Sequence, residues 1–260
     1  VQYRESDLGF VERLLAEEGI FYSVDVAGEP GEAPRDVVVF ADDAAAYEPI
    51  AGASALRFHE QSGNAQGREA VETFSFQRSV RPGASLLAGF DFRRPSVRLG
   101  ESAASDAPAA IAQHRVYEHE MDWSKWGLRP EAPAIHLAQQ RAGEAVGQGT
   151  SGCARLQPGR FFELEEHPRA DLNGRLALVR VEHEGRTPEV GSARVGASTD
   201  DVYTNRFSAV RADVPARPRR PARVIRQVME TATVVGPPGE EIHTDEHGRV
   251  KVQFHWDREG

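Results

Sequence analysis

The side chains in this chain that most resemble a metal site lie close together near its C-terminal end. His243 and His247 flank Asp245 and Glu246, and His255 follows on the next predicted strand. Imidazole and carboxylate groups are common zinc ligands. These residues, however, surround a predicted hairpin turn, and only His255 could add a ligand from beyond it. We therefore predict a solvated turn and no bound metal.

A glycine-rich segment at residues 147–152 satisfies the G-x-G-x-x-G pattern of dinucleotide-binding proteins letter for letter. A phosphate-binding turn requires a strand before the glycines and a helix after them. Here a predicted helix (132–146) comes first and a predicted strand (154–157) follows, which is the reverse order. Residues 149–153 also miss the nucleophile-elbow pattern at its last position. We interpret the segment as a flexible connector and predict no cofactor and no serine nucleophile.

Two other groups of side chains have the composition of hydrolytic sites. Cys153 and His167 could form a thiol nucleophile and its base, although a lone cysteine before an apolar strand is usually a small core residue. Glu163, Glu165 and Glu166 include two carboxylates on one strand face, and paired carboxylates can cleave glycosidic bonds. A solvent-facing strand surface or a contact between subunits accounts for them more simply. We predict no catalytic residue and no enzymatic activity in this chain.

The net charge of −9 describes an acidic surface, which argues against broad nucleic-acid binding. Residues 211–226 depart from this balance, with six arginines, three prolines and one acidic residue. Arg219 and Arg220 could contact a nucleic acid, but no aromatic side chains alternate with the arginines. The spacing of the prolines suits a stiff, extended linker. We predict such a linker at residues 211–227 and no nucleic-acid partner.

The composition predicts a mainly β protein of the α+β type. The 260 residues are 40% hydrophobic, which is enough for one large or two ordinary domains. The 24 glycines and 16 prolines separate short runs rich in valine and phenylalanine. Cys153 is the sole cysteine, so no internal disulfide can form, and no apolar run approaches the roughly 20 residues of a membrane span. No signal peptide precedes the first predicted element, and we expect an internal segment of a longer protein.

The first predicted element is a helix that leads into a β-hairpin. Ser6 is a suitable N-cap, and the negative charge of Asp7 is favourable at the positive, N-terminal end of the helix dipole. Gly19 ends the segment at its C-terminus. The apolar stripe of this amphipathic helix consists of Leu8, Phe10, Val11, Leu14 and Leu15. Strands are predicted at 20–26 and 37–40, joined by a Gly/Pro loop at 28–34.

The central part of the chain is predicted to contain short strands and one further helix. Strands are expected at 56–59, 71–80, 85–92, 114–119, 154–157, 161–165, 176–182 and 202–210. Residues 81–83 supply a turn between the second and third of these strands, whose inward faces are marked by Phe74, Phe76, Phe90 and Phe92.

The connecting segments carry weaker signals. Residues 41–55 are expected to be a loop, 101–110 form a low-complexity patch, and 121–126 form a tryptophan-bearing loop. The second helix, 132–146, carries Ile135, Ala138, Ala142 and Ala145 on one side. Asn173–Gly174 predicts a turn between two strands.

The last stretch has the period of a strand with one buried and one wet face. Val250, Val252, Phe254 and Trp256 alternate with polar residues, and Asp245 to Gly248 supplies a turn before them. Ile242 is expected to fold back antiparallel, and 231–235 forms an earlier strand. We interpret these as the opening strands of a small barrel that does not close within the chain.

Several of these stretches together resemble one family, the valine-glycine repeat (VgrG) spike proteins of bacterial type VI secretion, relatives of phage tail hub and puncturing-spike proteins. Residues 1–22, VQYRESDLGFVERLLAEEGIFY, are similar to the helix-hairpin signature of the family. Residues 239–260, GEEIHTDEHGRVKVQFHWDREG, closely resemble the start of its OB-type barrel. Residues 90–95, 156–162 and 173–183 are similar to its later hub strands, whereas 96–130 match loosely.

This resemblance implies phage-hub-like β-barrel domains with two short helices, followed by the first strands of an OB-fold barrel. Residues 1–210 would form a partial hub domain, 211–227 the linker, and 228–260 a truncated OB-fold domain. The start of the first hub barrel, the rest of the OB barrel, a β-helical needle and any effector domain would lie outside this chain.

The resemblance also implies a structural role in a contractile injection apparatus. Three copies would form a homotrimer whose hub matches a hexameric tube protein of the Hcp type. A PAAR-repeat protein would cap the needle, effectors would travel with the missing C-terminal part, and baseplate components would bind the hub. The protein would be made in the bacterial cytoplasm without a signal peptide and secreted through the type VI apparatus into a target cell or the medium.

Two other functions remain open from the sequence. The first is a phage baseplate hub whose OB barrel is followed by a peptidoglycan hydrolase domain. The second is an OB-fold protein that binds an oligonucleotide or oligosaccharide, which the predicted barrel and the basic linker would suit.

The alternation in the last strand gives a testable prediction. Phe254→Asp or Trp256→Asp should destabilise the complete barrel far more than Lys251→Glu, because only the first two place a charge on the inward face. Thermal melts of the complete barrel measure the difference. Equal losses for the three variants would contradict the face assignment.

Overall fold

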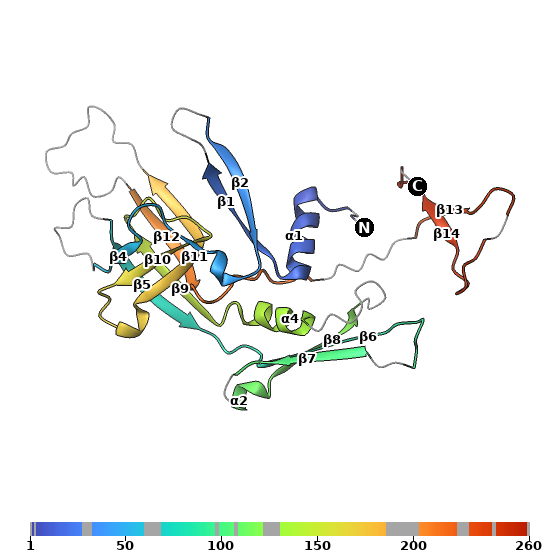
Figure 1. The fold of residues 1–260 in the computed structure, drawn as a ribbon, viewed down its shortest axis with the longest axis horizontal. Coiled ribbons are helices and arrows are strands. Elements are labelled where there is room, and N and C mark those ends of the chain that lie inside the picture. Colours follow the sequence, from blue (N-terminus) through green and yellow to red (C-terminus); the bar gives the residue numbers. More distant parts are fainter. Residues whose placement is uncertain are drawn as a thin grey trace. The chain divides into compact units, whose positions relative to one another are not determined.

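The structure is a computed structural model that describes residues 2, 4–27, 33–59, 69–96, 99–106, 109–121, 131–185, 203–222, 229–240 and 243–258. The chain forms two compact units, Val1–Pro221 and Ala222–Gly260, and most of its regular elements are strands (Figure 1). No helix in these ranges is long and apolar enough to cross a membrane.

Helix α1 (Asp7–Glu18) begins and ends where its local signals predict. The Ser6 hydroxyl accepts a hydrogen bond from the Gly9 amide at 3.1 Å, which satisfies a free donor at the helix start. Gly19 adopts φ 71°, and its amide bonds back to Ala16. Both predicted caps are confirmed. The apolar stripe is only partly covered, because Leu8 and Leu14 remain exposed.

The predicted hairpin is confirmed. Strands β1 (Phe21–Ala27) and β2 (Arg35–Ala41) pair antiparallel along their whole length. Most of the predicted loop between them, 28–34, lies outside the described residues.

The largest sheet closes on itself. Its strands follow the order β3-β10-β11-β12-β9-β5, and β4 pairs with β10 beside β3. Phe58, just after β4, forms a parallel bridge to Val71 of β5 and donates its amide to the Glu165 carbonyl at 2.8 Å. These contacts complete a ring through β4, β10, β11, β12, β9 and β5. The strand bounds are β3 Glu48–Pro49, β4 Ala55–Arg57, β5 Val71–Arg78, β9 Ala145–Ser151, β10 Arg160–Glu165, β11 Gly174–Gly185 and β12 Tyr203–Arg211.

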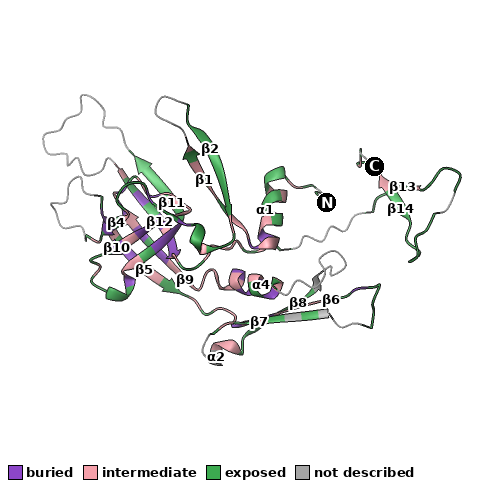
Figure 2. Cartoon of the chain, viewed as in Figure 1, coloured by how far each residue is buried: buried purple, intermediate pink, exposed green. Residues whose placement is uncertain are grey.

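The ring encloses the main hydrophobic core. Buried residues concentrate on its strands, as Figure 2 shows in purple. Aromatic rings meet at its centre, where Phe207 stacks on Phe74 at 6.0 Å and lies edge-on to Phe162 at 5.5 Å. The cluster consists of Ile50, Leu56, Val71, Phe74, Cys153, Leu156, Phe162, Leu164, Leu172, Leu176, Leu178, Phe207 and Ala209.

The interpretation of residues 147–152 as a flexible connector was wrong. The second helix, α4 (Ala132–Arg141), ends five residues earlier than predicted. Gly147 and Gly149 lie in β9, which is hydrogen-bonded to β12 on one side and β5 on the other. A Cβ on Gly147 would lie 2.6 Å from Cζ of Phe74, and one on Gly149 would lie 2.6 Å from Cζ of Phe207. Glycine is required here because the core rings fill the space that a side chain would occupy.

A second sheet contains β6 (Ala84–Gly89), β7 (Leu99–Ala104) and β8 (Arg115–Met121). Strand β6 lies in the middle, antiparallel to β7 and parallel to β8. The predicted hairpin turn at 81–83 was therefore wrong, since β5 and β6 belong to different sheets. A Cβ on Gly83 would lie 2.5 Å from the Ile111 carbonyl oxygen, so this glycine permits a close approach to α2 (Ala109–Ala112).

Three other expectations differ from the structure. Phe90 and Phe92 lie beyond the end of β6 and are exposed, so they do not mark an inward face. Residues 154–157 form turns and not a strand, although Leu156 is buried. The expected loop at 41–55 contains β3 and the 3-10 turn η1 (Ala44–Ala46). The tryptophan-bearing loop at 122–126 lies outside the described residues.

The other predicted strands of the ring are confirmed. Strands β10, β11 and β12 coincide with the stretches predicted at 161–165, 176–182 and 202–210. Gly174 adopts φ 117° where β11 begins, and the turn before it contains the 3-10 element η2 (Ala170–Leu172).

In the smaller unit, β13 (Ala232–Val235) pairs antiparallel with β14 (Lys251–Phe254). The predicted turn before β14 is confirmed, since Gly248 adopts φ 74° and its amide bonds to the Asp245 carbonyl at 3.0 Å. The alternating side chains expected to be buried, however, include three that are exposed, Val250, Val252 and Trp256. A two-stranded sheet has no second layer to cover them. Ile242 lies outside the described residues.

A buried polar network fastens α4 to the second sheet. His136 is 2% exposed, and its Nδ1 lies 2.8 Å from the hydroxyl of Ser85, which is fully buried on β6. Its Nε2 lies 3.1 Å from the carboxylate of Glu118 on β8. Burial lowers the pKa of His136, with Glu118 acting in the opposite direction. Each ring nitrogen of His136 thus has a polar neighbour, and the Gln140 side-chain nitrogen also lies 3.2 Å from Nε2.

The glycines of β9 predict a position-specific loss of stability. Gly149→Ala should reduce the free energy of unfolding by about 2 kcal/mol, because the new methyl group meets the Phe207 ring and the Thr73 carbonyl. Gly100→Ala on β7 is the matched control, since its Cβ would make only ordinary contacts at 3.6 Å and beyond. Urea unfolding should show a change within about 0.5 kcal/mol for the control. Similar losses for both variants would contradict the packing argument.

The buried histidine predicts a loss of stability in mild acid. Because the pKa of His136 is lower in the folded chain than the usual 6.5, the unfolded chain binds the proton more readily. Neutral His136 therefore makes its full contribution to the free energy of unfolding above about pH 6.5. Below that pH this contribution decreases, by at most about 1.4 kcal/mol per pH unit. Unfolding free energies at pH 7.5 and 5.5 should therefore differ more for the native chain than for His136→Gln. The exposed His255→Gln is the control, and an unchanged pH dependence in His136→Gln would refute the assignment.

Candidate functional site

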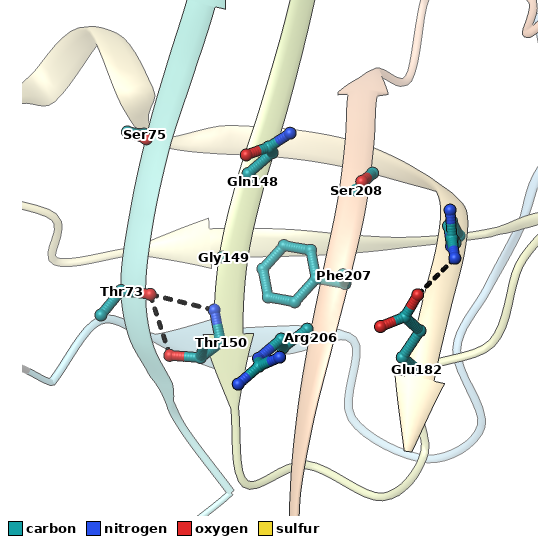
Figure 3. Close-up of a pocket in the computed structure, with 10 residues that line it drawn as sticks. Thr73, Ser75, Gln148, Gly149, Thr150, Glu182, Arg206, Phe207 and Ser208 are labelled. Atoms are coloured by element: carbon teal, nitrogen blue, oxygen red, sulfur yellow. Dashed lines mark hydrogen bonds and ion pairs between the residues drawn. The ribbon is translucent and has the colours of Figure 1, made fainter. Parts of the chain in front are cut away.

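The outer face of the ring carries an ordered array of polar side chains around a shallow hollow of about 390 Å³. The strand registers align them in two rows across β5, β9, β12 and β11 (Figure 3). The first row is Thr73, Thr150, Arg206 and Glu182, and the second is Ser75, Gln148, Ser208 and Arg180.

The chemistry of this array is hydrogen bonding and not bond cleavage. Thr73 and Thr150 join their hydroxyls at 2.8 Å, and the Thr150 amide donates to the Thr73 hydroxyl at 3.1 Å (Figure 3). Arg180 forms an ion pair with Glu182. No hydroxyl in the array is hydrogen-bonded to a base in the interactions that the structure describes, which a serine or threonine nucleophile would require. The array is what one solvated face of an antiparallel sheet provides.

Ser85, His136 and Glu118 have the composition of a hydrolytic triad but not its accessibility. Ser85 is completely buried, so no substrate carbonyl can reach its hydroxyl. Glu118 also lies 3.8 Å from Arg220, which connects the network to the segment after β12. The network therefore positions α4, β6, β8 and this segment relative to one another.

The sequence did not predict this network, because the apolar side noted for this helix does not contain His136. That side carries Ile135 and Ala138, which are half-buried, whereas the buried residues include Pro133, His136 and Leu137. A usable signal was the pair Pro133 and Leu137, which are four residues apart and share one helix face. His136 lies between them in sequence and is buried with them.

Cys153 and His167 do not form a nucleophile and base. Cys153 is fully buried in the core, and burial raises the pKa of its thiol. His167 packs against Phe58 at 4.2 Å, and its Nδ1 accepts a hydrogen bond from the Arg169 amide at 3.0 Å. Cys153 is a small core residue, as expected, and His167 packs against Phe58 and stabilises a turn.

The acidic residues of β10 lie on the side of the strand opposite the core. Glu163 and Glu165 alternate with the buried Phe162 and Leu164. Glu166, just beyond the strand, is exposed and forms an ion pair with Arg57 at 3.3 Å. No enclosed cavity surrounds them among the hollows described, so the geometry favours a surface role.

The polar side chains of the terminal turn stabilise the turn itself. The Asp245 carboxylate accepts hydrogen bonds from the Arg249 and His247 amides, both at 2.9 Å, and from the Arg249 guanidinium. These bonds lower the pKa of Asp245 to about 2. His243 bonds to Glu240 at 2.8 Å, and His255 lies 3.1 Å from Thr231. Within the described part of the chain, no three such side chains converge on one point.

Two arginines after β12, Arg217 and Arg220, form contacts within the first unit, which extends to Pro221. Arg217 donates to the Gly19 carbonyl at 3.0 Å, and the Ala216 amide donates to the Tyr47 hydroxyl at 2.8 Å. Arg220 approaches Glu118. These contacts engage two of the arginines that a nucleic acid could otherwise bind.

The comparisons with known proteins agree with a hub architecture. The model of the phage tail baseplate hub family (GPD) matches residues 1–189. The chain is 38% identical over its whole length to the type VI secretion system spike protein VgrG4b of Pseudomonas aeruginosa. It is 32% identical over 99% of its length to VgrG1c of the same organism. These matches cover 32% and 35% of the two relatives, so the chain spans about a third of their length.

Solved structures show the same fold at lower identity. One is the E. coli c3393 protein, a type VI secretion component with structural similarity to the T4 bacteriophage tail proteins gp27 and gp5. It matches with a TM-score of 0.57 and 19% identity, over 98% of this chain and 51% of that one. The tail protein from Neisseria meningitidis MC58 matches with a TM-score of 0.50 and 12% identity, over 84% of this chain and 59% of that one. Because the family model covers residues 1–189, well over half of the sequence, the chain belongs to the phage tail baseplate hub family.

Proposed function

We propose that this chain is the hub and neck portion of a structural spike component of a bacterial type VI secretion apparatus. The observation that carries the proposal is the similarity to VgrG spike proteins over the entire chain. The closed β-ring supports it physically, because a closed sheet has no free edges and resists deformation under axial load. Its function would be mechanical, transmitting thrust from a contracting sheath and carrying effectors across a target envelope.

The proposed domain organisation is a partial hub at residues 1–210, a linker at 211–227 and an OB-fold domain beginning at 228. The separation of the chain into two compact units supports a division in this region. The β13-β14 pair and the turn at Asp245 support the opening of a small barrel in the second unit.

The proposed partners follow from the same role. Three copies would form a trimer whose hub matches a hexameric tube protein of the Hcp type. A PAAR-repeat tip protein, effectors and baseplate components would complete the assembly, and the protein would leave the cytoplasm through the apparatus itself. No catalytic residue, metal or cofactor is assigned to this chain, and any enzymatic activity would belong to a domain outside it.

A second candidate function is the hub of a phage baseplate, which the family match favours. In that case the full-length protein would carry a peptidoglycan hydrolase domain after its OB barrel. Turbidity loss of a peptidoglycan suspension by the full-length protein separates this function from a spike without such a domain.

The proposed function predicts the mass of the full-length protein in solution. Light scattering at micromolar concentration should give three times the mass of one chain, because a hub that matches a hexameric tube requires three copies. A monomer under these conditions would remove the proposed function.

A further inference from the structure

One face of the β1-β2 hairpin is apolar and uncovered. The strand register places its members opposite one another, with Tyr22 facing Phe40 and Val24 facing Val38. The two rings lie 6.2 Å apart. We call this surface the valine face, and its members, between 37% and 63% exposed, are Tyr22, Val24, Val26, Val38 and Phe40. Figure 2 shows the hairpin largely in green, in contrast to the ring.

The opposite face of the hairpin is attached to the body of the protein through β1, whereas Val37 and Val39 of β2 on that face are exposed. Phe21 packs against Tyr47 at 5.4 Å, and Asp25 forms an ion pair with Arg160. The Gln157 side chain donates to the Val24 carbonyl at 3.1 Å. The hairpin is thus held from one side, and the valine face is directed away from these contacts.

Exposure of the valine face to water is thermodynamically unfavourable. A two-stranded hairpin is marginally stable by itself, and a contiguous apolar face on it stays hydrated unless another surface covers it. Helix α1 lies beside this face, because the Tyr22 hydroxyl bonds to the Glu12 carboxylate at 2.8 Å. That carboxylate and Asp36, which pairs with Val26 across the hairpin, place negative charge at the rim of the valine face.

A complementary surface exists elsewhere on the same unit. A groove of about 480 Å³ is lined by small and aromatic side chains together with Arg175 and Arg211, and with one carboxylate, Asp213. The Arg175 guanidinium lies 5.2 Å from the centre of the Phe161 ring, and no carboxylate pairs with it in the interactions described. The groove therefore combines apolar walls with positive charge, which are the two properties that the valine face and its acidic rim require. Its other lining residues include Ala45, Tyr47 and Ala212.

We propose that the valine face of one copy docks on the arginine-bearing groove of the next copy. This inference rests on the proposed trimeric function and names the surfaces that make the contact. Each copy carries a net charge of −9, so an apolar contact between copies needs a local basic patch to offset repulsion. The two surfaces differ, so the contact is heterologous, and three such contacts can close into a ring.

Two variants, each with one added cysteine, test the contact in the full-length protein. Val38→Cys places a thiol on the valine face, and Ala45→Cys places one in the groove, while the natural Cys153 is fully buried. When the two variants are co-expressed and exposed to oxidised glutathione, a disulfide between them must join different copies. We expect at least ten times more cross-linked dimer on a non-reducing gel than either variant gives alone.

The matched control is Val39→Cys with Ala45→Cys. Val39 is adjacent on the same strand and similarly exposed, 41% against 48% for Val38, but points to the opposite face. A trimer by light scattering with no more cross-linking for Val38 than for Val39 would overturn this inference and leave the proposed function intact. A monomer by light scattering would instead remove the proposed function.

Discussion

The fold of the first unit depends on the close contact between core aromatic rings and the glycine strand β9. Phe74 from β5 and Phe207 from β12 reach across the strand between them at the positions of Gly147 and Gly149. Rings of this size fit at these two positions only because neither glycine carries a side chain toward them. The absence of a Cβ at Gly147 and Gly149 therefore lets the core rings pack against β9, and the bridge between Phe58 and Val71 completes the closure of the ring.

Arginine joins the loops around this ring. Arg155 bonds to the Glu69 carboxylate and to the Ala53 carbonyl at 2.9 Å, and Arg160 pairs with Asp25 and with Glu48 at 2.7 Å. A guanidinium carries five donors on a rigid plane, so one side chain can satisfy a carboxylate and a backbone carbonyl together. The arginine content of the chain thus has a structural use, and an excess of arginine over lysine is no sign of nucleic-acid binding here.

The sequence predicted elements whose signals are local. Helix α1 was predicted because Ser6 and Gly19 cap it directly, and the turn at Asp245 was predicted because its residues bond to one another. Strand β9 was missed because its glycines are explained only by Phe74 and Phe207, which lie far away in the chain. The turn at residues 81–83 was misassigned for a similar reason, since Gly83 is needed for the approach of α2 and not for a hairpin. The residues of a short stretch cannot show which side chains from distant parts of the sequence will pack against it.

The same reasoning explains why the residues that resemble active sites are not arranged as one here. A catalytic or metal-binding group needs an open lone pair or an open space beside it. The Asp245 carboxylate is filled by donors from its own turn, the hydroxyl of Ser85 is enclosed, and the thiol of Cys153 lies in the core. The polar array on the ring can form hydrogen bonds with water, whereas the apolar valine face cannot, so contact with another protein surface would stabilise the valine face.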